Sequence, residues 1–356
     1  TQFRVTTWGE SHGKALGAVV DGCPAGLPLE EADVQRYLDR RRPGQSVLTT
    51  SRKEADEVEI LSGVFRGQTT GTPISLLVRN TAQRSQDYDE LESYYRPGHA
   101  DYTYEGKYGI RDHRGGGRSS GRETIGRVAA GAIAAKLLEE LGIRIHSYTK
   151  NIGDITIDPR FSNPAYWVDA QDADTLTRMP DLAADQAAQQ LMKEVREDAD
   201  SLGGVIECVV LGTPVGLGEP VFGKLDAELS KAIMSIGAVK AVEIGDGVKA
   251  ATLRGSQSND APSGATNHAG GILGGISNGN PIVLRAHIKP TPSVAKAQQT
   301  LNRDLEEITV QIKGRHDPII VPRAVVVVEA MTALVLADAI LLNMGTKLEA
   351  VKRFYQ

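Results

Sequence analysis

The stretch RDHRGGGRSSGRET, residues 111–124, combines residue types that bind anions. Glycines let backbone N–H groups approach a ligand closely, and arginine forks bind phosphate or carboxylate oxygens two at a time. The stretch leads into a predicted helix, whose N-terminus favours phosphate. Arg118, Ser119 and Ser120 are therefore predicted to line an anion site. A flexible surface loop with solvated arginines is the alternative interpretation of the same composition.

A second cluster of arginines, Arg40, Arg41 and Arg42, lies in LDRRRPG at the end of a predicted helix. A positive charge near a helix C-terminus stabilises the helix through the helix dipole. This effect explains one arginine at the helix end more readily than three. A second anion site and a solvated helix end are both compatible with this pattern.

Two histidines lie in turns flanked by glycine. His12 follows Ser11 in WGESHG, and His99 lies in RPGHADYTY. Histidine is the side chain best suited to proton transfer near neutral pH. A single loop histidine is more often structural, but two beside arginine-rich turns are candidates for an acid and a base.

Two further polar turns, KPTPS (289–293) and KGRHDP (313–318), add a lysine, hydroxyl groups, Arg315 and Asp317. The histidines and carboxylates lack the paired spacing that is typical of metal ligands. We therefore expect no metal site.

The elements that must position these residues form an α/β pattern. Short runs rich in β-branched residues and bounded by Gly or Pro predict strands at 3–8, 16–22, 57–65, 73–80, 205–212 and 281–289. Helical patterns cover 30–42, 121–142, 185–203 and 224–236, followed by an apolar stretch at 325–342. Ser120 and Glu123 form a possible capping box at the start of the second of these helices.

The two halves of the sequence resemble each other. VVDGCPAGLPL (19–29) aligns with VVLGTPVGLGEP (209–220) on P-x-G-L, and each is followed by a predicted helix. We predict one domain over 1–356 with two internally similar halves, about 1–145 and 200–345. Chance similarity between Gly/Pro turns is the alternative.

Composition limits the classes of function. The chain has 356 residues and a net charge of −5, which argues against bulk nucleic-acid binding. Glu329 and Asp338 interrupt the apolar stretch, so we expect a buried core helix and no membrane partner. The two cysteines, Cys23 and Cys208, lie in apolar runs and are expected to be buried thiols in a reducing compartment, the cytoplasm.

The residues alone thus indicate an α/β enzyme with anion-binding turns and two acid–base histidines. They leave phosphoryl transfer, phosphate elimination and phosphosugar isomerisation open. An RNA-binding module is a third class of function, and the net negative charge weighs against it.

Six motifs narrow these alternatives: GESHG, RPGHADYTY, RGGGRSSGRET, VKAVEIGDG, NHAGGILGGISNG and GRHDP, in this order. Together they resemble the chorismate synthase family over nearly the whole chain. The resemblance implies an anti-1,4-elimination of phosphate from 5-enolpyruvylshikimate 3-phosphate to give chorismate, with a requirement for reduced FMN. It also implies a homotetramer, and helices sandwiched between antiparallel sheets in a pseudo-duplicated core.

The resemblance implies a role for each matching residue. His12, with Ser11 beside it, would face the reduced flavin, and His99 would protonate the departing phosphate. Asp317 would lie near flavin N5 and help to relay the C6 proton, and Ser120 would lie where flavin and substrate meet. Implied flavin contacts are Arg118, Ser119, Ser120, Gly237, Ala238, Gly274, Lys289, Pro290, Thr291, Pro292, Ser293 and Arg315. Implied substrate contacts are Arg40, Arg41, Arg118 and Arg315.

The sequence departs from the family pattern at position 47, which is Val where many relatives carry a basic residue. One anion contact is therefore in doubt, and Arg52 is a candidate replacement. NADPH is a candidate reductant for the flavin. The chain lacks the long insertions of the bifunctional fungal form, so we expect an external flavin reductase.

Overall fold

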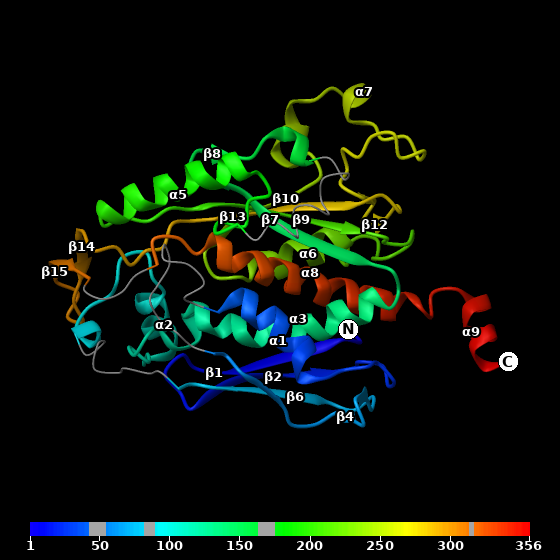
Figure 1. Cartoon of the computed structure of the whole chain (residues 1–356), viewed down its shortest axis with the longest axis horizontal. Helices are drawn as coiled ribbons and strands as arrows, with labels where there is room; N and C mark the ends of the chain where they lie inside the picture. The colour runs from blue at the N-terminus through cyan, green and yellow to red at the C-terminus, as the bar shows by residue number, and fades with distance from the viewer. Residues whose placement is uncertain (43–54, 82–89, 163–174, 313–316) are drawn as a thin grey trace.

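Two antiparallel sheets enclose a layer of helices in the computed structural model, which describes residues 1–42, 55–81, 90–162, 175–312 and 317–356. Figure 1 shows the three layers, with helices α1, α3, α6 and α8 between the sheets. This arrangement confirms the predicted α/β class with helices sandwiched between antiparallel sheets.

The first sheet has the strand order β1 (Arg4–Gly9), β2 (Ala15–Asp21), β6 (Ile74–Arg79) and β3 (Val58–Ile60). In β6, Ile74, Leu76 and Val78 are buried and alternate with more exposed residues, because successive side chains of a strand point to opposite faces. A small hairpin of β4 (Val64–Phe65) and β5 (Gln68–Thr69) lies between β3 and β6 in the chain.

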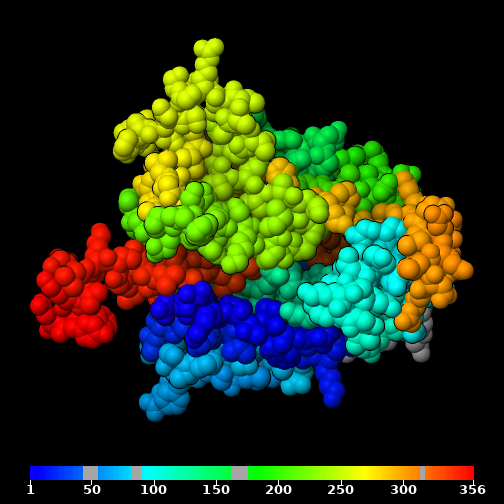
Figure 2. All heavy atoms as spheres, turned by 180° about the vertical axis from the view of Figure 1, so that it is seen from behind, coloured from blue at the N-terminus to red at the C-terminus, as the bar shows by residue number. Residues whose placement is uncertain are grey.

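The second sheet has the order β10 (Val239–Ile244), β13 (Ile282–Ile288), β9 (Gly204–Leu211), β7 (Arg144–Ile152) and β8 (Ile155–Thr156). A small hairpin of β11 (Ile272–Leu273) and β12 (Ile276–Ser277) lies between β10 and β13 in the chain, as β4 and β5 lie between β3 and β6. The hairpin of β14 (Ala297–Leu301) and β15 (Glu307–Gln311) follows β13. Figure 2 shows this hairpin, in orange, against the cyan segment near residue 95, and Tyr95 N donates to Leu301 O there at 3.0 Å.

The enclosed helices are α1 (Glu31–Arg41), α3 (Thr124–Glu139), α6 (Leu225–Met234) and α8 (Val321–Asn343). The others are α2 (Asp101–Tyr108), α5 (Leu182–Glu197), α7 (Gly255–Ser258) and α9 (Leu348–Tyr355).

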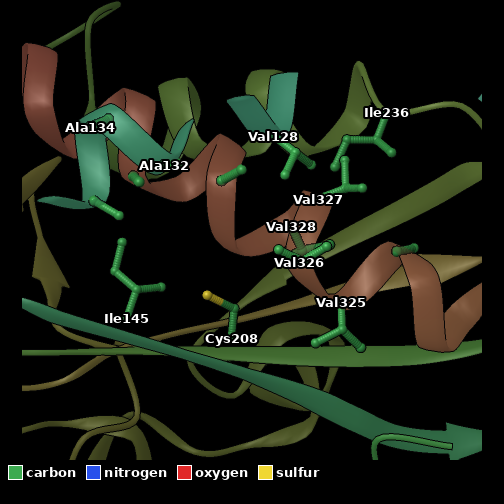
Figure 3. Close-up of a cluster of buried hydrophobic side chains, with 14 of the residues drawn as sticks. Val128, Ala132, Ala134, Ile145, Cys208, Ile236, Val325, Val326, Val327 and Val328 are labelled. Atoms are coloured by element: carbon green, nitrogen blue, oxygen red, sulfur yellow. The ribbon is translucent and has the colours of Figure 1, made fainter. Parts of the chain in front are cut away.

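Helix α8 is the predicted core helix. It has the length and hydropathy of a membrane span, but 61% of its most apolar window is buried inside the protein. A Cβ added at Gly131 of α3 would lie 2.3 Å from Cβ of Ala330, so the two helices pack at close range. Figure 3 shows Val325–Val328 of α8 in one apolar cluster with Val128 and Cys208. Cys208 and Cys23 are buried free thiols, as predicted.

The first P-x-G-L turn is held by a hydroxyl residue of its half's small hairpin. Gly26 N donates to Thr69 O at 2.8 Å, and Leu27 N donates to Thr69 Oγ1 at 3.0 Å. The Thr69 hydroxyl donates to Pro24 O at 2.6 Å. Gly26 has φ +90°, a conformation that favours glycine.

The second P-x-G-L turn has the same contacts. Gly216 N donates to Ser277 O at 3.0 Å, Leu217 N donates to Ser277 Oγ at 2.9 Å, and the Ser277 hydroxyl donates to Pro214 O at 2.6 Å. The four longest strands of each sheet are also arranged in the same order, first–second–fourth–third. The first of these strands in the second sheet, β7, lies before the predicted second half at residues 200–345. These shared details support the proposal of two similar halves in one domain.

Candidate active site

The glycine-rich loop lies between the two predicted histidines. Gly115 and Gly116 have φ +68° and +87°. A Cβ added at Gly115 would lie 2.6 Å from His12 Nε2 and 3.0 Å from Ser11 Oγ, and one added at Gly116 would lie 2.9 Å from His99 Cε1. Consecutive residues of this loop thus bring together two turns that lie 87 positions apart in the sequence.

We expect Gly115→Ala to displace His12 and to lower turnover, because the new methyl group would overlap the imidazole ring. Overpacking of this kind typically costs about 1–3 kcal/mol. Gly67→Ala is the matched control, since Gly67 has a similar φ of +74° but no atom within 4 Å of its added Cβ. Steady-state kinetics and urea unfolding of both variants would test this. Equal turnover in the two variants would contradict the close packing at His12.

Two side chains fix the turn that carries His12. Asn80 Nδ2 donates to Glu10 O at 3.1 Å and to Gly13 O at 2.8 Å. Arg118 Nη1 donates to Gly9 O at 2.9 Å, and Arg118 Nη2 donates to the Thr7 hydroxyl at 2.6 Å. The guanidinium of Arg118, predicted to contact ligands, thus holds the end of β1.

His99 lies beside a buried ion pair in its own turn. Its Nδ1 is 3.0 Å from Asp101 Oδ1 and 3.0 Å from Arg96 Nη2. Arg96 donates to both oxygens of Asp101, from Nε at 2.7 Å and from Nη2 at 2.8 Å. Burial by itself would raise the pKa of Asp101, but the hydrogen bonds from Arg96 and His99 hold it well below its usual range. The carboxylate is therefore ionised at neutral pH.

The KPTPS turn lies against the same histidine turn. Lys289 Nζ donates to Gly98 O at 2.8 Å, and a Cβ added at Gly98 would lie 3.1 Å from Cβ of Pro292. Lys289 N donates to Ala238 O at 2.9 Å, which brings Ala238 to this end of β13. The Thr291 hydroxyl is buried and has no hydrogen-bond partner among the described residues. Pro290 and Ser293 are part of this turn, and Gly237 precedes Ala238.

Ser119 and Ser120 lie between the glycine loop and α3. The Ser119 hydroxyl donates to Gly116 O at 2.7 Å. Ser120 Oγ accepts from Arg122 N at 3.3 Å and so caps a single 3₁₀ turn, Gly121–Glu123, before α3 begins at Thr124. Helical structure thus begins at residue 121, as predicted, but its first turn is a 3₁₀ turn and not part of the α-helix. Glu123 does not complete a capping box, because its carboxylate binds Arg127 Nε at 2.9 Å.

Arg41 is buried next to the segment that follows the glycine loop: it is only 2% exposed, and its Nη1 donates to Gly121 O at 3.4 Å. Its Nη2 donates to Asp56 Oδ2 at 2.7 Å, and Arg122 Nη1 donates to Asp56 Oδ1 at 3.1 Å. Arg122 Nε in turn donates to Asn80 Oδ1 at 2.7 Å, so this buried cluster continues into the turn that carries His12.

Asp317 joins the same cluster from the segment just before α8. Arg323 Nη1 donates to Asp317 Oδ2 at 2.6 Å, and Arg323 Nε donates to Arg41 O at 3.1 Å. Burial and then the nearby Arg41 lower the pKa of Arg323, while Asp317 opposes this shift. A continuous set of polar contacts therefore links Asp317 with the His12 turn. The site residues predicted from the sequence did not include four members of this set, Asp56, Asn80, Arg122 and Arg323.

We expect Asp56→Asn to lower the free energy of unfolding by about 3–5 kcal/mol, because it leaves the buried Arg41 and the partly buried Arg122 without their carboxylate. Asparagine tolerates the φ of +48° at this position, so the change tests the charge. Asp21→Asn removes an exposed ion pair with Arg4 and should cost less than about 1 kcal/mol. Urea unfolding would compare them, and equal losses would contradict the importance of the buried cluster.

The structure does not bring two of the predicted residues to this site. Arg40 points to another face of α1, where it binds both oxygens of Glu329 at 2.8 and 2.7 Å. There it lines a cavity of about 410 Å³ together with Tyr37 and Arg144. Gly274 lies in the β11–β12 hairpin, at the end of the molecule opposite α2 (Figure 1).

Three residues singled out in the sequence lie outside the described residues: Arg315, Val47 and Arg52. Among the residues that are described, no group of three or more His, Cys, Asp or Glu side chains could hold a metal ion.

Comparison with known proteins identifies the family. Residues 3–341 match the family model described as chorismate synthase. A chorismate synthase from Lachnoclostridium phytofermentans is 59% identical over 99% of this chain and 97% of its own length. Another, from Methanococcoides burtonii, is 55% identical over 94% of this chain and 93% of its own length.

A solved structure shows the same fold. The crystal structure of a chorismate synthase is 36% identical, covers 100% of this chain and 96% of its own, and superposes with a TM-score of 0.77. The chain therefore belongs to the chorismate synthase family, carbon–oxygen lyases that form chorismate in the shikimate pathway.

Proposed function

We propose that the site between the His12 and His99 turns eliminates phosphate from 5-enolpyruvylshikimate 3-phosphate to give chorismate. The observation that carries this proposal is the placement of both histidines against Gly115 and Gly116. An elimination needs an acid for the leaving group and a base for the departing proton, and this site offers candidates for both.

His99 is the proposed acid. A phosphate leaves more readily when it is protonated, and histidine can donate a proton near neutral pH. Lys289 reaches Gly98 O beside it and adds positive charge where the phosphate would depart. Three residues after the glycine loop are proposed to contact the ligands: Arg118, Ser119 and Ser120. Arg41 is proposed to hold the backbone that follows them, since its Nη1 donates to Gly121 O at 3.4 Å.

Asp317 is the proposed acceptor for the proton that leaves C6. Its carboxylate lies 2.6 Å from Arg323 Nη1, and a carboxylate can accept a proton. The elimination breaks the C6–H bond and the C3–O bond, and the C1=C2 double bond is replaced by double bonds C1=C6 and C2=C3, while phosphate leaves with the C3 oxygen. His12 and Ser11 are proposed to face the flavin.

The residues present suit reduced FMN. The buried hydroxyls of Ser11 and Thr291 have no hydrogen-bond partner in the described part of the chain, and Lys289 can pair with a phosphate. Ala238, Lys289, Pro290, Thr291, Pro292 and Ser293 would hold the cofactor. When bound, reduced FMN supplies electron density to the electron-poor allylic system as phosphate departs.

The assembly and supply of reductant are proposed from the family resemblance. We propose a cytoplasmic homotetramer that acts on a small-molecule substrate and receives its reduced FMN from an external flavin reductase. An aerobic assay with NADPH and FMN tests the last point. Turnover without added reductase would instead show that the chain reduces its own flavin.

An anaerobic assay of the purified protein tests the proposed function itself. Chorismate should form when substrate and chemically reduced FMN are both supplied, and no chorismate should form when the flavin is omitted. Turnover of the substrate at the same rate without flavin would favour a flavin-independent isomerase or phosphatase.

A further inference from the structure

We propose that Asp101 is the positioning residue for His99: its carboxylate accepts a hydrogen bond from Nδ1–H, so that Nε2 carries the transferable proton. The contact that suggests this is the 3.0 Å separation of His99 Nδ1 and Asp101 Oδ1. Within the described part of the chain, no hydrogen bond to Nε2 competes with a ligand.

Two neighbours compete for Nδ1, and they require opposite protonation states. Arg96 Nη2 is also 3.0 Å away, but a guanidinium only donates, so it can bind Nδ1 only when that nitrogen carries no proton. An ionised carboxylate only accepts, so Asp101 requires Nδ1–H. A histidine that acts as a general acid is an imidazolium, with a proton on both ring nitrogens, before it donates. In that form Nδ1–H of His99 can donate to Asp101 but cannot accept from Arg96.

The charges around His99 make this carboxylate necessary. Arg96 lies in the same turn, Arg111 Nη1 approaches Asp101 Oδ1 to 3.8 Å from the segment after α2, and Lys289 approaches from the end of β13. Three positively charged side chains therefore surround this turn. Among the described residues, the carboxylate in contact with the imidazole is that of Asp101. Without it, a protonated His99 would face an excess of positive charge.

The fold keeps Asp101 in the form that this role needs. The carboxyl group is 4% exposed and receives three hydrogen bonds from Arg96, including one from its backbone N–H at 3.1 Å. It therefore remains ionised at neutral pH. A carboxylate that orients a histidine usually contributes 10–100-fold to the function of that histidine in metal sites, and we expect a similar size here.

The test is nuclear magnetic resonance of the full-length protein labelled with ¹⁵N-histidine. In the wild type, the nitrogen shifts of neutral His99 should show the Nδ1–H tautomer. In Asp101→Asn, the pKa of His99 should fall by about one unit or more. Glu105→Gln is the matched control, because Glu105 is another carboxylate of α2 that binds Arg111, at 2.9 Å, without contacting His99. It should leave the pKa of His99 unchanged.

Kinetics add a second measurement, which rests on the proposed role of His99 as acid. If His99 must be protonated, activity falls as pH rises through its pKa, so Asp101→Asn should move the falling limb of the kcat/KM profile to lower pH. Turnover at the optimum should fall by about 10–100-fold. Glu105→Gln should not move the limb.

The two measurements separate the two claims. An Nε2–H tautomer in the wild type, or an unchanged His99 pKa in Asp101→Asn, would overturn the positioning role whatever the activity. A shifted pKa together with a fully active His99→Ala variant would instead support positioning and contradict the proposed acid. The wild-type tautomer needs no variant, so this test holds even if Asp101→Asn fails to fold.

Discussion

Replacing His99 with alanine is expected to lower turnover by about 100-fold or more, which is the usual contribution of one general acid. The methyl group cannot donate a proton, so the phosphate would have to leave without one. Reduced FMN should still bind, because the groups proposed to hold it lie on the KPTPS turn and at Ala238 and do not include the imidazole. Steady-state turnover and a flavin titration followed by absorbance would measure the two effects.

His268→Ala is the matched control for this variant. His268 also pairs through Nδ1 with a carboxylate, Asp246 Oδ2, at 2.8 Å. Its loop belongs to the other half of the chain and has no assigned role in the elimination. Near-normal turnover in His99→Ala, or an equal loss in His268→Ala, would remove His99 from the proposed mechanism.

Asp317→Asn is expected to lower turnover by about 100-fold or more while changing substrate and flavin affinity little. Asparagine has nearly the same size and can still accept a hydrogen bond from Arg323 Nη1, now 2.6 Å from Asp317 Oδ2. It cannot accept the C6 proton as a carboxylate can. Rapid mixing with reduced FMN and substrate would follow the reaction directly.

A structural role for Asp317 makes a different prediction, because the ion pair with Arg323 could simply fix the start of α8. Arg323→Lys weakens that pair and keeps the carboxylate. We expect Arg323→Lys to lose stability with a smaller loss of turnover than Asp317→Asn. Equal losses of turnover in the two variants would show that Asp317 acts through the ion pair alone.

The sequence predicted the elements that composition and turn residues mark clearly. The strands at 74–79 and 282–288 were predicted because they are rich in β-branched residues and bounded by Gly or Pro. The core helix α8 was predicted because it is a long apolar stretch that Glu329 and Asp338 interrupt. Strand β7 was missed because it contains Tyr148 and Lys150, which do not look like core residues. Their polar atoms bind Glu207 of the neighbouring strand β9, and a single sequence does not show that pairing.

The candidate site was predictable where a local signal marks a single turn, such as a glycine run, a histidine flanked by glycine, or the KPTPS run. The loop at 115–117 and both histidine turns carry such local signals. The Asp56 cluster carries such a signal only at Arg41, since Arg122 and Asp56 are 66 positions apart and meet only in the folded chain. Arg40 and Arg41 look equivalent in the sequence, but neighbours on a helix of 3.6 residues per turn point in directions about 100° apart. One therefore pairs with Asp56 and the other with Glu329.

A single-turnover experiment under anaerobic conditions tests most directly whether this site performs a flavin-dependent elimination without net oxidation. Enzyme loaded with reduced FMN is mixed with 5-enolpyruvylshikimate 3-phosphate, and chorismate, phosphate and the flavin spectrum are followed together. We predict equal amounts of chorismate and phosphate, with the flavin fully reduced at the end. Release of phosphate without chorismate, or oxidation of one flavin for each product formed, would contradict the account.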